Sequence, residues 1–319
     1  MTTFGDQVYQ YGGVPVNSFL TTGKVYFVKP STGSDGNTGK KPTSAFKTLA
    51  KAQSTATADK GDIVYMVAES NTAASTTDYQ SAALDWAKDG VHLIGIGVNP
   101  FIGQRARIAQ LSTATNVDNL FTLSGDNCYV ANIGIFHGVD DATSKVACLV
   151  SGQRNRVEGC QISGAGHATM DTADNPSLSV TGSENTFAKN YIGLDTIIRG
   201  TSVYEVLVSG AARTWFEDCM INSYTSASTF KAIQATSIDR FVVLKNCMLT
   251  AVQGITSSVA PTGAIATTTL NGQIWVLGGG VFGYADVTTA DNSAVLVLTH
   301  SGLAANVVDQ GVAKGTDVA

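Results

Sequence analysis

Charged side chains are scarce in this chain. Only 14% of its 319 residues are Asp, Glu, Lys or Arg, and the formal net charge is −5. Nucleic-acid-binding surfaces gather basic residues to neutralise phosphates, so the scattered Lys and Arg argue against nucleic acid as a partner. No apolar run reaches the length of a membrane span, and the opening MTTFGD lacks the basic and apolar regions of a signal peptide. We therefore expect synthesis in a cytoplasm, with neither nucleic acid nor membrane as partner.

Paired cysteines and compact catalytic motifs are missing as well. The five cysteines are an odd number and no CxxC occurs, so the chain has no zinc or redox pair at ligand spacing. It contains no nucleophile elbow, no HExxH and no phosphate loop. We predict no cofactor and no metal site, and we interpret the thiols as buried, reduced side chains suited to a cytoplasm.

What the chain does have is a repeat. Six segments between residues 121 and 283 share one pattern, with steps of 27, 30, 29, 28 and 33 residues between aligned positions. The first aligned apolar column is Val130, Val157, Phe187, Phe216, Leu244 and Leu277. A second apolar column follows five residues later, at Ile135, Ile162, Ile192, Ile221, Leu249 and Phe282. A period of this size predicts a solenoid whose coils stack around one shared core.

Between the two apolar columns lies a bend. Its position is occupied by Asn132, Gly159, Lys189, Asp218, Asn246 and Gly279. Five of these six are Gly, Asn or Asp, which tolerate a positive φ, so each repeat is predicted to run strand, one-residue bend, strand. The next, inward-facing position holds the predicted structural ladder of Cys160, Asn190, Cys219 and Cys247. An upstream strand, as at residues 121–123, 148–150, 178–180, 206–208 and 265–266, gives each coil three strands.

The segment before the repeats carries a family resemblance. It runs from a strand at residues 25–28 through the turn GSDGNTG and a helix expected over 44–58 to a buried strand at 63–67. This run resembles the entry segment of right-handed parallel β-helix proteins of the pectate-lyase-like superfamily. With the repeats, it implies an all-β, right-handed parallel β-helix of about eight coils with a short helix capping its N-terminal end. We expect an extended arm over residues 1–22, the entry segment over 23–70, coils over 71–300 and a C-terminal cap or tail over 301–319.

Many members of this superfamily cleave polysaccharides, so clustered carboxylates are the first candidates for a site. The best pair is Glu158 and Glu217, which share one register position two coils apart, with Ala188 between them and Lys245 one coil beyond. Two rungs separate them by roughly 9–10 Å, which is the upper limit of the distance between the two carboxyl groups of an inverting glycosidase. Outward charges on a solenoid are usually solvated surface, which is the first interpretation here. Catalysis by the pair is the alternative.

Two loops offer oxygen and nitrogen ligands. Asp140 and Asp141 follow His137, and a second loop holds Asp171, Asp174 and His167. Because Ca²⁺ takes six to eight oxygen ligands and neither loop supplies a full set, we interpret both loops as solvated surface.

The tryptophans are few, and two of them follow the repeat. Trp215 and Trp275 lie in predicted strands and are expected to line one outer face. Aromatic side chains on such a face stack on sugars or fill contacts between subunits, where Trp and Tyr are enriched. The sequence leaves both alternatives open.

The low charge, the Gly/Ser/Thr/Ala-rich texture and the short aromatic N-terminal arm resemble β-helical virion proteins of tailed bacteriophages, of the capsid-decoration or tailspike-like kind. The resemblance implies a non-enzymatic, homotrimeric protein located in the virion. Its arm would contact the major capsid protein or another virion protein through Phe4, Val8, Tyr9, Tyr11 and Pro15, or would simply cap the end of the solenoid. The alternatives are a tailspike-like polysaccharide lyase or hydrolase, and an adhesin that binds a cell-surface glycan.

Overall fold

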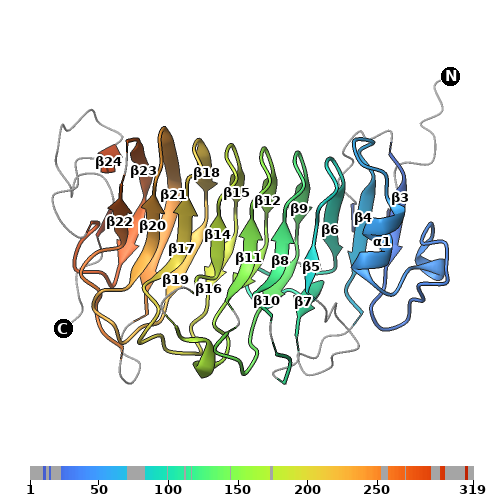
Figure 1. Ribbon diagram of the computed structural model, residues 1–319, viewed down its shortest axis with the longest axis horizontal. Helices are drawn as coiled ribbons and strands as arrows, with labels where there is room; N and C mark the ends of the chain where they lie inside the picture. Colours follow the sequence, from blue (N-terminus) through green and yellow to red (C-terminus); the bar gives the residue numbers. More distant parts are fainter. Residues whose placement is uncertain are drawn as a thin grey trace.

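The computed structural model describes residues 10–11, 14–15, 23–69, 83–98, 100–110, 113–115, 117–143, 145–172, 175–252, 258–269, 271–288, 295–298 and 313–314. Within them the chain forms a rod of stacked parallel coils (Figure 1), which confirms the right-handed parallel β-helix. Of the predicted docking residues, Phe4, Val8 and Tyr9 lie outside the described residues. Only the backbone of Tyr11 and Pro15 is described, in the antiparallel pair β1 (Gln10–Tyr11) and β2 (Val14–Pro15).

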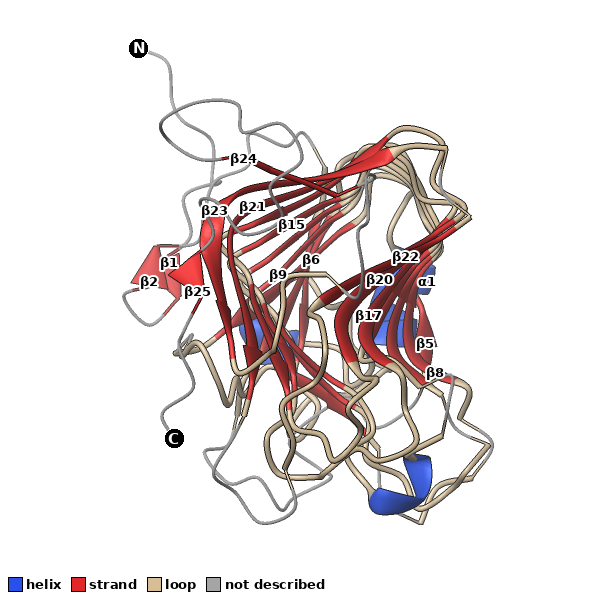
Figure 2. Ribbon diagram, turned by 90° about the vertical axis from the view of Figure 1, so that its left-hand side faces the viewer, coloured by secondary structure: helices blue, strands red, loops and turns tan. Residues whose placement is uncertain are grey.

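The prism has three faces, seen along the rod in Figure 2; faces 1 and 2 belong to one 16-stranded sheet, and face 3 is a 7-stranded sheet. Face 1 consists of β3 (Val25–Val28), β4 (Ile63–Val67), β6 (His92–Ile96), β9 (Tyr129–Ala131), β12 (Arg156–Glu158), β15 (Thr186–Ala188), β18 (Thr214–Glu217), the first halves of β21 (Phe241–Ala251) and β23 (Gln273–Phe282), and β24 (Val295–Leu298). Face 2 consists of β7 (Arg107–Ala109), β10 (Gly134–Phe136), β13 (Gln161–Ser163), β16 (Tyr191–Gly193), β19 (Met220–Ser223), the second halves of β21 and β23, and β25 (Ala313–Lys314). Face 3 consists of β5 (Leu84–Asp85), β8 (Asn119–Leu123), β11 (Val146–Val150), β14 (Leu178–Val180), β17 (Tyr204–Ser209), β20 (Lys231–Thr236) and β22 (Ile265–Thr268). The rod has about seven turns where about eight were predicted.

The predicted bends separate face 1 from face 2 in five coils. Asn132, Gly159, Lys189, Asp218 and Asn246 have φ values between 52° and 61°. The positive φ turns the chain by one residue without breaking the hydrogen-bonded ladder, because the N–H groups of the first four bends donate to carbonyls of the next coil, as Gly159 does to Ala188 at 2.9 Å. We call the line of bends the bend ridge.

In the last coil the predicted register was wrong by one residue. Leu244 pairs with Val276, not Leu277, and Leu249 pairs with Val281, not Phe282. The bend accordingly begins at Gly278, one residue before the predicted Gly279. The sequence alignment followed the larger apolar side chains, but the core accepts Val276 and Val281, while Phe282 points outward and is 37% exposed.

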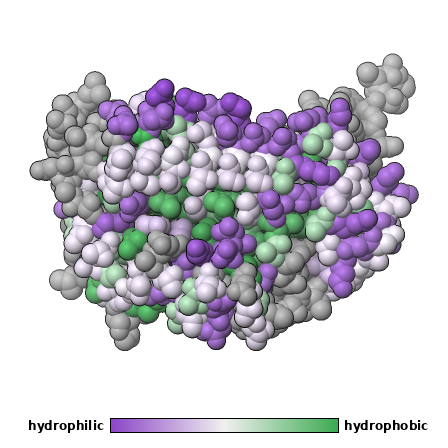
Figure 3. Space-filling view, viewed as in Figure 1, coloured by the Kyte–Doolittle hydropathy of each residue, from purple (hydrophilic) through white to green (hydrophobic). Residues whose placement is uncertain are grey.

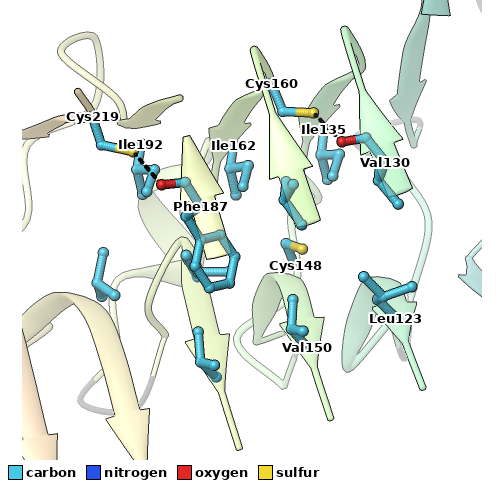
Figure 4. Packing of buried hydrophobic residues seen from close by; sticks show 14 of the residues in the cluster. Leu123, Val130, Ile135, Cys148, Val150, Cys160, Ile162, Phe187, Ile192 and Cys219 are labelled. Atoms are coloured by element: carbon cyan, nitrogen blue, oxygen red, sulfur yellow. Dashed lines mark hydrogen bonds between the residues drawn. The ribbon is translucent and has the colours of Figure 1, made fainter. Parts of the chain in front are cut away.

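Inside the prism, equivalent residues of successive coils stack in ladders (Figure 4). Cys160, Asn190, Cys219 and Cys247 occupy one inward column, and all of them are buried. The Cys160 thiol lies 3.8 Å from the Val130 carbonyl oxygen, and the Cys219 thiol lies 3.4 Å from that of Phe187. All five cysteines of the chain are buried and free. Beside them the rings of Phe187 and Phe216 stack with centroids 4.9 Å apart.

A second ladder, of asparagines, lies at the corner between faces 3 and 1 and was not predicted. The Asn155 Oδ1 accepts from the Cys128 N–H at 2.7 Å, and the Asn185 Oδ1 accepts from the Asn155 N–H at 2.8 Å. Their amide groups donate to the carbonyls of Gly125 and Gly152. These bonds satisfy backbone groups that the turn leaves without a strand partner. In the sequence, an asparagine two residues before Val157 and another two residues before Phe187 could have predicted this ladder.

The outside of that corner is a charged row. Glu184 pairs with Arg154 at 2.7 Å and with Arg213 at 2.5 Å, from the coils on either side. Figure 3 shows hydrophilic residues along this upper edge of the rod. Exposed pairs of this kind contribute little to stability.

The entry segment contains a helix shorter than predicted. Helix α1 spans Leu49–Thr55, with Thr48 as its N-cap, rather than residues 44–58. The preceding residues are held extended by Asp35 of the GSDGNTG turn, which accepts from the Lys47 and Thr48 N–H groups at 2.9 Å. A short 3-10 helix at Pro42–Ser44 comes before them. Leu49 and Ala52 are buried against the N-terminal coil. No helix in the described part of the chain is long and apolar enough to cross a membrane.

Candidate functional site

The outer surface of face 1 carries two columns of side chains that include the predicted candidates. Strand pairing places Glu158, Ala188, Glu217 and Lys245 in one line. Two residues earlier in each strand, the second outward column contains Tyr129, Arg156, Thr186, Trp215, Val243 and Trp275. Face 1 is therefore the side of the rod where carboxylates, basic groups and aromatics meet.

Both glutamates are held in ion pairs. Glu217 lies 2.6 Å from the Lys245 ammonium, and that hydrogen bond lowers the pKa of the Glu217 carboxyl. Glu158 lies 2.8 Å from the Arg156 Nε and accepts from the Tyr129 hydroxyl at 3.3 Å. A general acid needs a carboxyl whose pKa is raised toward the working pH. Glu217 has the opposite shift and therefore does not suit the role of the general acid.

A hollow of about 240 Å³ opens beside Glu158. Its floor is the bend ridge, and its lining residues are Phe101, Gln104, Asn132, Glu158, Gly159 and Lys189. The loop between β6 and β7 forms one wall, because the Gly103 N–H donates to the Gln161 Oε1 at 2.6 Å and the Gln104 amide donates to the Gly159 carbonyl. We call this hollow the ridge pocket.

The ridge pocket has the chemistry of a binding site for a small polar group. The exposed ammonium of Lys189 and the carboxylate of Glu158 offer a donor and an acceptor, and the ring of Phe101 offers an apolar wall. Across the residues that the structure describes, no three His, Cys, Asp or Glu side chains lie close enough together to hold a metal ion. The pocket was not predicted, because its wall and floor come from residues 55–58 positions apart that follow no repeat.

Two of the three tryptophans lie in the outer column of face 1. Trp215 and Trp275 are separated by the Val243 rung. The Trp275 ring stacks on Phe241 with centroids 4.6 Å apart and planes 11° apart, so its orientation is fixed. Trp86 is fully buried and donates to the Val91 carbonyl at 2.8 Å, which makes it part of the core.

The first of the two loops with Asp and His residues does not converge on a shared centre. Asp141 caps its own turn by accepting from the Thr143 N–H at 2.9 Å. Asp140 lies 3.4 Å from the His167 ring. His137 is buried with its Nε2 3.0 Å from the Val117 carbonyl, and burial lowers the pKa of its ring.

In the second loop, Asp171 accepts from the N–H groups of Gly200, Thr201 and Ser202 at 2.7–3.0 Å. Burial by itself would raise the pKa of this carboxyl, but the backbone donors outweigh it and the net pKa is lowered. Asp174 lies outside the described residues. Asp171 therefore organises the backbone of a neighbouring loop.

A buried ion pair between Arg199 and Glu205 also escaped sequence analysis. The Arg199 Nη2 lies 3.4 Å from the Glu205 Oε1, and their side chains are 2% and 0% exposed. Ser177 donates to the same carboxylate oxygen, and the Arg199 Nη1 donates to the Asn175 carbonyl at 3.0 Å. Burial raises the pKa of Glu205, while Arg199 and Ser177 oppose that rise. Both charges are closed off from solvent, so the pair ties two loops to face 3.

No model of a known protein family matches the chain, and no curated protein matches it. Among solved structures, it is similar to pectate lyase Pel9A, with a TM-score of 0.58 and 12% identity over 86% of this chain and 68% of that one. It is also similar to the pectin methylesterase from Aspergillus niger, with a TM-score of 0.48 and 13% identity over 93% and 91% of the two chains. At 12% identity the likeness to pectate lyase Pel9A shows a shared fold and no more, and it agrees with the right-handed parallel β-helix.

Proposed function

We propose that this chain is a non-enzymatic structural protein of a tailed-phage virion, a homotrimeric decoration protein whose β-helical rod projects from the capsid. The observation that carries the non-enzymatic part is the pairing of Glu158 with Arg156 and of Glu217 with Lys245. Both carboxylates are thereby paired with a neighbouring cation on face 1. The phage part is supported by the resemblance of the sequence to β-helical virion proteins.

The core supports the same proposal. Five free, buried thiols suit a protein that folds in a reducing cytoplasm and needs no disulfide for stability. Continuous ladders across about seven turns give a stiff rod, because each coil is fixed by both of its neighbours. A stiff, weakly charged rod suits a structural component of a virus particle.

Phage particles that contain this chain provide the test. We expect cryo-electron microscopy to show rods on the capsid shell, and mass spectrometry to find the chain in stoichiometric amounts. A variant that lacks residues 1–22 should keep its β-helix, because β3 begins at Val25, yet no longer attach to purified shells. Rods at the tail or baseplate, or particles without the chain, would contradict the decoration role.

Glycan binding without cleavage is the second candidate, and a specific observation favours it. Trp215 and Trp275 present their rings in one outer column of face 1, on the same side of the rod as Glu217 and Lys245. Aromatic faces beside charged and amide groups are the usual means of holding a polar chain in a fixed orientation. The ridge pocket lies farther along the same side, beside Glu158.

Removing both rings should abolish most of any glycan affinity. We expect Trp215→Ala combined with Trp275→Ala to weaken binding to the best glycan-array hit by about tenfold or more, since each ring contributes on the order of 1 kcal/mol. Calorimetry with the purified chain measures the change, and Leu207→Ala on face 3 is the control that should bind normally. An array without hits, or equal affinity for all three proteins, would reject glycan binding at this face.

A further inference from the structure

Face 2 carries large apolar side chains that are open to solvent. Phe101 is 48% exposed, Ile102 51%, Met248 44% and Phe282 37%. Four of the five large apolar side chains that are exposed in the described part of the chain are therefore on or beside this one side of the rod. Contiguous exposed apolar surface on a soluble protein marks an interaction site.

These side chains lie in two neighbouring columns along one side of the rod, joined across Tyr191, which is itself only 2% exposed. The Phe101 ring meets the Tyr191 ring edge-on, with centroids 5.7 Å apart. Strand pairing then places Tyr191 beside Met220 and Met220 beside Met248. Phe282 follows in the next coil, paired with Thr250. We call Phe101, Ile102, Tyr191, Met220, Met248 and Phe282 the face-2 stripe.

Neutral residues lie between the members of the stripe, and charges of both signs lie at its margins. Its polar neighbours are Gln161, Asn222 and Thr250, and they are tied into the sheet: the Asn222 amide donates to the Tyr191 hydroxyl at 2.9 Å and the Thr250 hydroxyl donates to the Asn222 Oδ1 at 2.6 Å. The charges near it are Lys189 and Asp218 on the bend ridge, Glu158, which lines the ridge pocket together with Phe101, and Arg107, farther along the outward column of Tyr191. An apolar, charge-depleted centre with a polar rim, rich in aromatics and Met, is the composition of a protein–protein interface.

We propose that the face-2 stripe is the contact between copies of this chain, which pack side by side with their rods parallel. A second copy fits this surface because the centre of the stripe, Met220 and Met248, is uncharged and the charges at its margins are of both signs. Lys189 and Asp218 carry opposite charges one coil apart, so packed copies meet mixed charges at the rim. Face 2 has eight rungs in the described part of the chain, which span on the order of 30 Å. That length suits a standard interface of about 800 Å² per partner.

The proposal stands whether or not the rod belongs to a phage particle, so its failure and the failure of the decoration role can be told apart. The first measurement is the mass of the purified full chain at micromolar concentration by light scattering. We expect a dimer or trimer for the unmodified chain. Met220→Lys combined with Met248→Lys should weaken association by at least a hundredfold, because the copies then place ammonium groups opposite one another in a dry contact.

Face 3 supplies the matched control. Leu149 and Leu207 are partly exposed outward positions there, one on each side of the Ser179 rung. Leu149→Lys combined with Leu207→Lys should leave the oligomer intact. A monomeric unmodified chain would overturn the proposal, and so would equal masses for the two lysine pairs.

If the lysine pair on face 2 fails to fold, Met248→Cys decides instead. The native thiols are buried, so a short thiol-reactive cross-linker should join copies through position 248. Leu207→Cys should give no cross-linked product. Equal cross-linking at both positions, or none at 248, would show that the stripe is not the contact.

Discussion

Replacing Cys219 with Asp is expected to destabilise the β-helix by about 3–5 kcal/mol, the cost of an uncompensated charge in a protein interior. Cys219 is 1% exposed and faces the core. Its thiol is 3.4 Å from the carbonyl oxygens of Phe187 and Glu217. A carboxylate there lies against these two acceptors, the Asn190 amide that donates to the thiol is 3.9 Å away, and the coils above and below leave the carboxylate no path to water.

The variant Cys219→Asn tests whether the loss of stability in Cys219→Asp comes from the charge or from the size of the new side chain. The same column already contains an asparagine, Asn190, whose Oδ1 accepts from the Cys160 N–H at 2.8 Å and whose amide donates to the Val157 carbonyl at 3.0 Å. The new amide can donate to the Phe187 carbonyl in the equivalent way, so Cys219→Asn should lose far less stability than Cys219→Asp. Guanidinium unfolding followed by circular dichroism compares the two. Coincident transitions for the Asp and Asn variants would mean that this column does not face a dry core.

The regular part of the fold could be predicted because each coil repeats the same local rules. Bends at Asn132, Gly159 and Asp218 need only a residue that tolerates a positive φ, and the apolar columns on either side need only alternate. The same rule failed in the last coil, where glycine fills several positions and apolar size misled the alignment. Strand pairing sets Val276 and Val281 opposite Leu244 and Leu249, so the smaller valines, and not Leu277 and Phe282, face the core.

Of the candidate site, the sequence predicted only which residues share one column of face 1. The line of Glu158, Ala188, Glu217 and Lys245 follows from the repeat, since strand pairing fixes which residues share a register. The ion partner Arg156 and the ridge pocket do not follow from it. Whether Glu158 turns toward Arg156 depends on side-chain torsions, and the loop that carries Phe101 has no periodic counterpart.

Arg199→Met is the second variant with a large expected effect, a loss of about 3–5 kcal/mol near neutral pH. Methionine fills much of the same volume, so the cavity is small and the loss comes mainly from leaving Glu205 buried without its cation. The variant also gives up the hydrogen bond to the Asn175 carbonyl and the contact of the guanidinium with the Phe230 ring, 5.9 Å from its centroid. Reversible chemical unfolding of the variant and the unmodified chain measures the difference.

The pH dependence of that loss identifies its cause. Burial raises the pKa of Glu205 and Arg199 opposes the rise, so removing Arg199 raises the pKa of the folded-state carboxyl further. When the pKa of a carboxyl is higher in the folded state than its unfolded value of about 4.3, the protonated carboxyl contributes its full stability below about pH 4.3. That contribution to the free energy of unfolding is lost as the pH rises through the folded-state pKa. The deficit of Arg199→Met should therefore be smallest near pH 4 and grow toward neutrality. Adding Glu205→Gln should flatten this dependence and recover part of the stability, because no charge then remains to bury. A deficit that stays constant across this range would assign the loss to packing around Phe230 instead of to the buried charge.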